Sequence, residues 1–140
     1  MTIHIRQATE ADQNAIRQIV RAARINPTGL DWRRFVVADE DGRVVATGQI
    51  KPHRDGSREL ASIATVPERQ KSGLASRVIN RLLEQERGPV YLVCRAKLET
   101  FYPRFGFHVA RADEVQMPFR LMPPFMRLAN GRIMKRDAPQ

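Results

Sequence analysis

The chain has 140 residues, of which 42% are hydrophobic and 28% are charged, and its formal net charge at pH 7 is +9. This length and composition predict a single globular domain over residues 1–140 and exclude an intrinsically disordered chain. No apolar run approaches the roughly 20 residues of a membrane-spanning helix. The alternating, polar start of the sequence does not resemble a secretory signal, so we expect a cytoplasmic location and no membrane partner.

The positive charge has two interpretations. It is either a solvated basic surface or a surface for an acidic partner, such as nucleic acid or a phosphorylated or carboxylated small molecule. The basic residues are scattered and only 6% of the residues are aromatic, which argues against nucleic acid. The lone cysteine, Cys94, excludes an internal disulfide, and the three histidines are far apart, so no metal site is expected.

Hydrophobic periodicity and turn residues divide the chain into strands and helices. Thr9, with Asp12 three residues later, predicts the start of the first helix, and Asp41–Gly42 predicts a tight hairpin turn. Strands are predicted over residues 2–8, both arms of a hairpin at 34–51, 59–66, 90–96, 106–112 and 132–137. Helices are predicted over residues 9–24 and 73–86, together with a short helix over 98–107 that is broken at Pro103. A helical turn is predicted over 125–129 in an ambiguous stretch.

This order, β-α-β-β-β-α-β-α-β, predicts the α+β class. We expect a mixed, mostly antiparallel central sheet with flanking helices. The strands at 59–66 and 90–96 are joined through a helix, so they should run parallel to each other.

The loop before the second helix reads Gln70-Lys71-Ser72-Gly73-Leu74-Ala75. If a helix begins near Gly73, the amides of residues 71–76 are its unpaired first turn, and together with the helix dipole they favour an anion. Arg69 and Lys71 would add positive charge. The alternative is an ordinary strand-to-helix turn in which Ser72 is only the N-cap.

Two motifs carry a resemblance to a known family. Gln70-x-x-Gly73-x-Ala75 resembles the Q/R-x-x-G-x-G/A pyrophosphate loop of the GNAT superfamily of N-acetyltransferases, and "FYPRFGF" at 101–107 resembles the late F-Y-x-x-x-G-F helix of that family. They flank the strand at 90–96 in the order of the family. The resemblance covers residues 1 to about 110, and the chain loosely resembles small N-acetylglutamate-synthase-like members.

The resemblance implies that acetyl-CoA is the co-substrate. Its pantetheine arm would pair with the main chain of the strand at 59–66, and its pyrophosphate would accept from the loop amides. Thr65 stands where the family usually has an apolar residue, and Arg69 stands where it often has an aromatic one. Binding through the backbone would tolerate both differences. The implied cofactor-binding residues are Ile63, Ala64, Thr65, Gln70, Lys71, Ser72, Gly73, Leu74, Ala75 and Ser76.

The resemblance also implies catalytic residues for direct transfer to a primary amine in a ternary complex. Such transfer needs a deprotonated amine and a proton for the thiolate. Tyr102 falls on the tyrosine of the family and would protonate the thiolate, unless it only packs in the core. Glu59, eleven residues before Gln70, would be the base as in histone-acetylating members, unless it is a surface residue paired with Arg58 or another arginine. A water chain is the other route.

Several residues remain lesser candidates. His53 and Glu99 are further candidates for the base, and Cys94 is expected to be buried and inert. Arg95 stands where many members have an asparagine, so it would bind a carboxylate or a phosphate or point to solvent. Trp32 is either an acceptor-site residue or a core residue.

We expect the acceptor to be a small amine or amino acid, bound near residues 24–35 and 112–134. An arginine-lined site would favour an acidic acceptor. Acetylation of protein lysines or N-termini, and a catalytically silent acyl-CoA-binding module, are the alternatives. The apolar segment 117–126 would either cover the site or form a homodimer contact.

Overall fold

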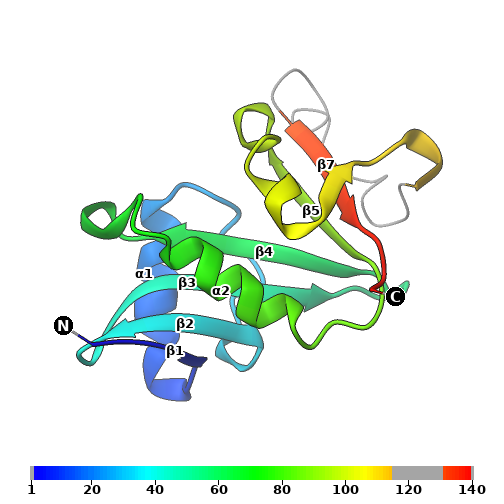
Figure 1. Ribbon diagram of the computed structural model, residues 1–140. Helices are drawn as coiled ribbons and strands as arrows, with labels where there is room; N and C mark the ends of the chain where they lie inside the picture. The colour runs from blue at the N-terminus through cyan, green and yellow to red at the C-terminus, as the bar shows by residue number, and fades with distance from the viewer. Residues whose placement is uncertain (1, 115–130, 140) are drawn as a thin grey trace. The chain divides into compact units, whose positions relative to one another are not determined.

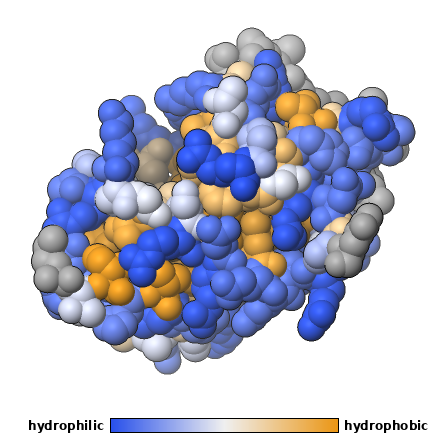
Figure 2. All heavy atoms as spheres, in the orientation of Figure 1, coloured by the Kyte–Doolittle hydropathy of each residue, from blue (hydrophilic) through white to orange (hydrophobic). Residues whose placement is uncertain are grey.

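The computed structural model describes residues 2–114 and 131–139 (Figure 1). Within them, no helix combines the length and the apolar character that crossing a membrane requires. Figure 2 shows that the visible face is mostly hydrophilic, as the share of charged residues leads one to expect. The strands are β1 (Ile3–Gln7), β2 (Phe35–Glu40), β3 (Arg43–Pro52), β4 (Arg58–Thr65), β5 (Val90–Arg95), β6 (Phe107–Val109) and β7 (Gly131–Arg136), and the α-helices are α1 (Gln13–Ala22) and α2 (Leu74–Leu83).

The strands of the described residues form a mixed sheet. They are hydrogen-bonded in the order β1-β2-β3-β4-β5-β7-β6. Strands β1 and β2, β2 and β3, β5 and β7, and β6 and β7 pair antiparallel. Strands β4 and β5 pair parallel, with Glu59 opposite Tyr91. The predicted α+β class, the hairpin at Asp41–Gly42 and the parallel pair are confirmed.

The chain divides into two compact units. Unit 1 comprises Met1–Lys51 and Leu60–Gln85, and unit 2 comprises Pro52–Glu59 and Glu86–Gln140. Each unit has fully buried apolar side chains of its own. In unit 1 they include Ile16, Val20, Phe35, Val37, Val78 and Ile79, and in unit 2 they include Val90, Leu92 and Met134.

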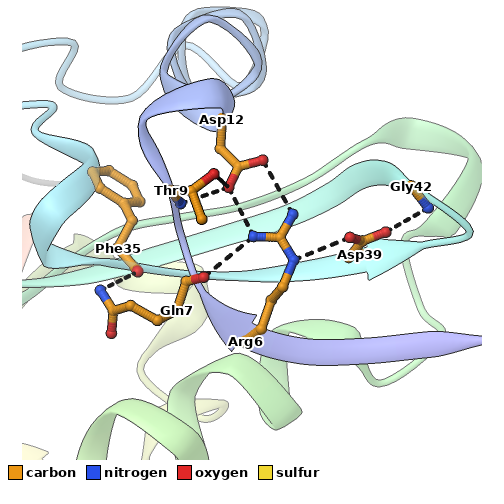
Figure 3. Close-up of polar contacts among 7 residues, drawn as sticks. All are labelled: Arg6, Gln7, Thr9, Asp12, Phe35, Asp39 and Gly42. Carbon is orange, nitrogen blue, oxygen red and sulfur yellow. Dashed lines mark hydrogen bonds and ion pairs between the residues drawn. The ribbon is translucent and has the colours of Figure 1, made fainter.

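A partly buried ionic network organises unit 1 around Arg6 of β1 (Figure 3). Its guanidinium donates to Asp12 Oδ2 at 2.8 Å and Oδ1 at 3.1 Å, and its Nε donates to Asp39 Oδ2 at 3.0 Å. Asp39 Oδ1 accepts from the amide of Gly42 at 2.7 Å, and Asp12 Oδ2 accepts from the amide of Thr9 at 2.7 Å. The hydrogen bonds from Arg6 hold the pKa of Asp12 below its usual range. The predicted capping pair is confirmed, and the same carboxylate ties β1 to the start of the first helix.

The two α-helices cover opposite faces of the unit 1 strands (Figure 1). On one face, Ile16 and Val20 of α1 pack with Phe35 and Val37. On the other face α2 approaches β3 closely, because position 48 is a glycine. A Cβ at Gly48 would lie 2.6 Å from Ile63 Cδ1 and 2.8 Å from Val78 Cγ1.

Two helix predictions need correction. The short helix predicted over 98–107, with a break at Pro103, is instead two separate 3-10 helices, Ala96–Leu98 and Tyr102–Phe105, and Pro103 lies inside the second of them. Pro103 lacks an amide hydrogen and Gly106 is left-handed at φ 92°, so the second turn cannot extend into an α-helix. The helix predicted over 73–86 is present but ends at Leu83. The helical turn at 125–129 and the segment 117–126 lie outside the described residues.

We predict that Gly48→Ala destabilises the fold. The added methyl group overlaps with Ile63 and Val78, and overpacking of this kind costs about 1–3 kcal/mol. The free energy of unfolding measured in urea should fall by that amount. The control is Gly88→Ala, where a Cβ would meet nothing within 4 Å, so the change should stay within about 0.5 kcal/mol. Equal effects of the two substitutions would contradict the close approach.

Candidate functional site

The loop between β4 and α2 presents open backbone amides. Gly73, at φ 82°, is the N-cap of α2, and Lys71 is also left-handed at φ 64°. Among the described residues, no acceptor is bonded to the amides of Lys71, Ser72 and Gly73. The first-turn amides of α2 have no partner inside the helix, by its geometry. A Cβ at Gly73 would meet nothing within 4 Å, so open space lies beside these donors. The loop can therefore accept an anion.

Two side chains of this loop act differently from the prediction. The guanidinium of Arg69 binds Glu40 of β2, with Nε 2.7 Å from Oε2 and Nη2 2.6 Å from Oε1. Its charge is therefore matched by a carboxylate, and the expectation that Arg69 adds charge to the loop was wrong. The Ser72 hydroxyl donates to the carbonyl of Arg69, and the N-cap residue of α2 is Gly73 and not Ser72.

Strand β4 contains a strained residue beside the predicted pantetheine-binding segment. Ser62 has φ 59°, which is unusual for a non-glycine residue in a strand and typical of an irregular or bulged one. Two buried side chains of β3 hold it: Thr47 Oγ1 donates to the Ser62 carbonyl at 2.9 Å, and Gln49 Nε2 donates to Ser62 Oγ at 2.9 Å. The three residues that follow, Ile63, Ala64 and Thr65, are buried or half-buried and complete the strand. The carbonyl of the last accepts from Gln70 Nε2 at 3.3 Å.

Gln49 also connects β3 to the loop after α1. Its Nε2 donates to the carbonyl of Gly29 at 3.2 Å, and its Oε1 accepts from Arg34 Nε at 3.2 Å. Arg34 Nη2 donates to the same Gly29 carbonyl at 2.9 Å, and Lys51 Nζ donates to the carbonyl of Thr28 at 3.0 Å. A Cβ at Gly29 would lie 3.2 Å from Lys51 Nζ and 3.8 Å from Arg34 Nη2, so two half-buried cations flank this glycine. The sequence prediction named residues 24–35 as part of the acceptor region but included neither Gln49 nor Lys51.

Trp32 is half-buried and packs against the apolar cluster around Ile16 and Phe35. The guanidinium carbon of Arg33 lies 4.9 Å from the centre of its ring. Trp32 also lines a hollow of about 440 Å³ together with residues of α1, among them Gln13. Core packing is thus confirmed for Trp32, and its role toward an acceptor stays a prediction.

In unit 2, Tyr102 is 8% exposed and packs edge-on against Phe101 and Phe107, with ring centres 5.1 and 6.0 Å away. Burial, with a smaller effect of Cys94, raises the pKa of Tyr102 to about 12. The hydroxyl therefore stays protonated at neutral pH and can donate a proton. Burial likewise raises the pKa of Cys94 to about 11, and its Sγ lies 3.8 Å from Met134 Sδ. This thiol is not ionised at neutral pH, as the prediction of an inert cysteine requires.

Glu59 pairs with a histidine and not with the neighbouring arginine. His53 Nε2 lies 2.9 Å from Glu59 Oε1, and both side chains are mostly shielded from solvent. Arg58 binds Glu86 instead, with Nε 2.6 Å from Oε1. The pairing of Glu59 with Arg58, one form of the alternative, was therefore wrong, and two of the predicted candidates for the base lie in contact.

Arg95 and Glu99 are the remaining candidates of unit 2. Arg95 is exposed at the end of β5. Glu99 forms an ion pair with Arg132, whose Nε lies 2.8 Å from Glu99 Oε2. Their roles toward an acceptor and as a base stay predictions.

One further group of potential metal ligands lies in unit 2. Ligand atoms of His108, Glu114 and Asp137 lie within 4.8 Å of one another. Lys135 Nζ lies 3.6 Å from Glu114 Oε2 and 3.7 Å from Asp137 Oδ1, so an ammonium already supplies the positive charge. The amide of Arg111, and secondarily His108, lower the pKa of Glu114 to about 2. The group is explained by these ion pairs.

The family follows from comparison with known proteins. The model of the Acetyltransferase (GNAT) domain family matches residues 31–109, which include the open loop, Glu59 and Tyr102. This match covers more than half of the chain, so the chain belongs to the GNAT acetyltransferase family. No curated protein matches it in sequence.

Solved structures share the fold. N-acetylglutamate synthase from Neisseria gonorrhoeae, complexed with coenzyme A and N-acetyl-glutamate, superposes with a TM-score of 0.81 at 18% identity, covering 100% of this chain and 36% of that chain. The chain spans about a third of the length of this synthase. Rv2747 from Mycobacterium tuberculosis, in a complex that contains CoA, has a TM-score of 0.77 at 20% identity, with coverage of 97% and 99%. Escherichia coli ElaA has a TM-score of 0.74 at 17% identity, with coverage of 97% and 100%.

We predict that Gln49→Leu loosens the loop after α1. The substitution leaves the Gly29 carbonyl, the Ser62 hydroxyl and Arg34 each without one hydrogen bond, at a total cost of about 1–3 kcal/mol in unfolding free energy. Hydrogen–deuterium exchange of residues 26–31 should become faster. The exposed Gln85, changed to leucine, is the matched control and should alter neither quantity. Unchanged exchange in the Gln49 variant would contradict the anchoring role.

Proposed function

We propose that this chain transfers an acetyl group from acetyl-CoA to the primary amine of a small carboxylated molecule, such as an amino acid. Membership of the GNAT acetyltransferase family supports the reaction class. The open backbone amides at Gly73 support the binding of acetyl-CoA, the acetyl donor. The two cations at Gly29 support the binding of a carboxylated amine, the acetyl acceptor.

The loop between β4 and α2, residues 66–73, is called the donor loop from here on. It fits the pyrophosphate of acetyl-CoA, the acetyl donor. The open space beside Gly73 admits a phosphate to backbone donors that none of the described residues occupies, and the dipole of α2 points its positive end there. The exposed Lys71 adds a positive charge at the same loop. The main chain of Ile63 to Thr65 would bind the pantetheine arm, as the family resemblance implies.

The proposed reaction needs two proton transfers, and each is assigned to a residue of unit 2. Bound acetyl-CoA supplies a thioester, whose carbonyl carbon forms a bond to the amine nitrogen while its carbon–sulfur bond breaks. The departing thiolate takes the proton of the Tyr102 hydroxyl, which is available because its pKa of about 12 keeps it protonated at neutral pH. The amine must lose a proton before it attacks, and Glu59, with His53 at 2.9 Å, would accept that proton directly or through water.

The acceptor class follows from charge. Arg34 donates to two neutral oxygens, those of Gln49 and Gly29, so its positive charge can still attract an anion. Lys51 lies beside the same glycine. A guanidinium and an ammonium placed together suit a carboxylate better than a polyamine, which they would repel. The synthase structure with N-acetyl-glutamate supports an acidic amino acid as the first acceptor to examine.

The proposed reaction is tested by thiol release from acetyl-CoA with a panel of acidic, neutral and basic amino acids, polyamines and peptides. The proposal predicts turnover with an acidic amino acid and acetylation of its amine by mass spectrometry. Turnover restricted to peptides would mean a protein acetyltransferase. Binding of CoA with no acceptor-dependent turnover would mean a silent acyl-CoA-binding module.

We predict that Tyr102→Phe lowers kcat with little change in the KM for acetyl-CoA. The loss of a general acid typically costs about a hundredfold in rate. Phenylalanine retains the ring contacts with Phe101 and Phe107, so the melting temperature serves as the control and should not fall. Full turnover in a folded variant would refute the role of Tyr102 as the proton donor.

We predict that Arg34→Gln raises the KM for a carboxylated acceptor about tenfold, because one charged hydrogen bond is lost. The KM for an analogue in which an amide replaces the carboxylate should change much less. The matched control is Arg21→Gln, which removes the same charge from an exposed position in the last turn of α1. Equal changes in KM for acid and amide would show that Arg34 has no role in recognising charge.

A further inference from the structure

The hairpin between β2 and β3 binds the start of the donor loop through two crossed ion pairs. Glu40, the last residue of β2, receives two hydrogen bonds from Arg69 at 2.7 and 2.6 Å. Arg43, the first residue of β3, donates to Glu68. Each segment thus contributes one carboxylate and one guanidinium. The two ion pairs together fix the position of the hairpin relative to the loop.

The two ion pairs differ in strength. The Glu40 side chain is 10% exposed and that of Arg69 is 30% exposed, and their contact is bidentate. Arg69 holds the pKa of Glu40 below its usual range, as a carboxylate beside a guanidinium should behave. The side chains of Arg43 and Glu68 are about half exposed, so that pair contributes little. The Glu40–Arg69 pair is therefore the main link.

The hairpin that carries Glu40 is itself held in place by other hydrogen bonds. Asp39, next to Glu40, is held by Arg6 and by the amide of Gly42 (Figure 3). On the other side, the carbonyl of Arg69 accepts from the Ser72 hydroxyl, so the loop folds back on the residue that the hairpin holds. The amides that have no acceptor within residues 2–114 and 131–139 begin two residues after Arg69.

We propose that Glu40 is a positioning residue for binding of the donor. By holding Arg69, it keeps the loop in the conformation that exposes its amides before the ligand arrives, and so lowers the ordering cost of binding. This inference rests on the proposed function of the loop as the pyrophosphate site. Glu40 itself does not touch the ligand.

If Glu40 instead competed with the ligand for Arg69, its removal would strengthen the binding of CoA and not weaken it. If Arg69 were a ligand of the phosphates, Glu40 would compete with them. Removing its charge would then free Arg69 and tighten the binding of an anion, as would the gain of one positive charge. The positioning role predicts weaker binding despite that gain.

The experiment measures the Kd of CoA by isothermal titration calorimetry for wild type, Glu40→Gln and Glu40→Asp. The Kd of both variants should rise about tenfold. The aspartate variant keeps the charge but is too short for the bidentate contact, and it serves if the glutamine variant does not fold. The control is Glu84→Gln, which changes the net charge equally at the exposed C-terminal end of α2 and should leave the Kd unchanged.

A second readout separates positioning from general destabilisation. At saturating acetyl-CoA, kcat and the KM for the acceptor should equal those of wild type, and only the KM for acetyl-CoA should rise. An unchanged or lower Kd in the Glu40 variants would overturn the inference while the proposed function stands. A wild-type chain that binds no CoA would overturn both.

Discussion

The guanidinium of Arg6 is the interaction on which much of unit 1 depends. It lies between two carboxylates, Asp12 and Asp39, that come from the start of the first helix and from the hairpin. Removing it would leave two largely buried acids near each other without their cation, which is far more costly than the loss of an exposed ion pair. Through Asp39 this arrangement reaches the hairpin, and through Glu40 it reaches the loop before α2.

A second polar network lies inside the sheet, around the fully buried Gln49. Its amide satisfies three partners at once: the hydroxyl of the strained Ser62, the carbonyl of Gly29 and the guanidinium of Arg34. The predicted donor-binding strand and the proposed acceptor loop are thus connected by one side chain. A change of conformation in either segment must be accommodated by this amide, because a buried amide that loses a partner is costly.

Local features of the sequence predicted well the elements whose causes are local. The turn at Asp41–Gly42, the cap formed by Thr9 and Asp12, and the glycine that starts α2 depend on neighbouring residues only. The contacts that position the candidate site depend on residues far apart. Thr47 and Gln49 alternate with apolar residues in β3, a pattern that normally indicates a solvent-facing side of a strand, yet both are fully buried. Nothing near Arg69 in the sequence indicates that Glu40 matches its charge, and only the fold brings the two together.

The buried phenol of Tyr102 has a consequence for kinetics. A proton donor with a pKa of about 12 keeps its proton throughout the range in which enzymes are usually assayed. In its proposed role as the acid for the leaving group, Tyr102 therefore cannot produce a fall in rate on the alkaline side of a pH–rate profile near neutrality. In the proposed reaction, an ionisation visible between neutral and moderately alkaline pH would belong to the amine that attacks or to the group that deprotonates it. The profile would thus report the chemistry of the acceptor, and its apparent pKa should move when one amine is exchanged for another.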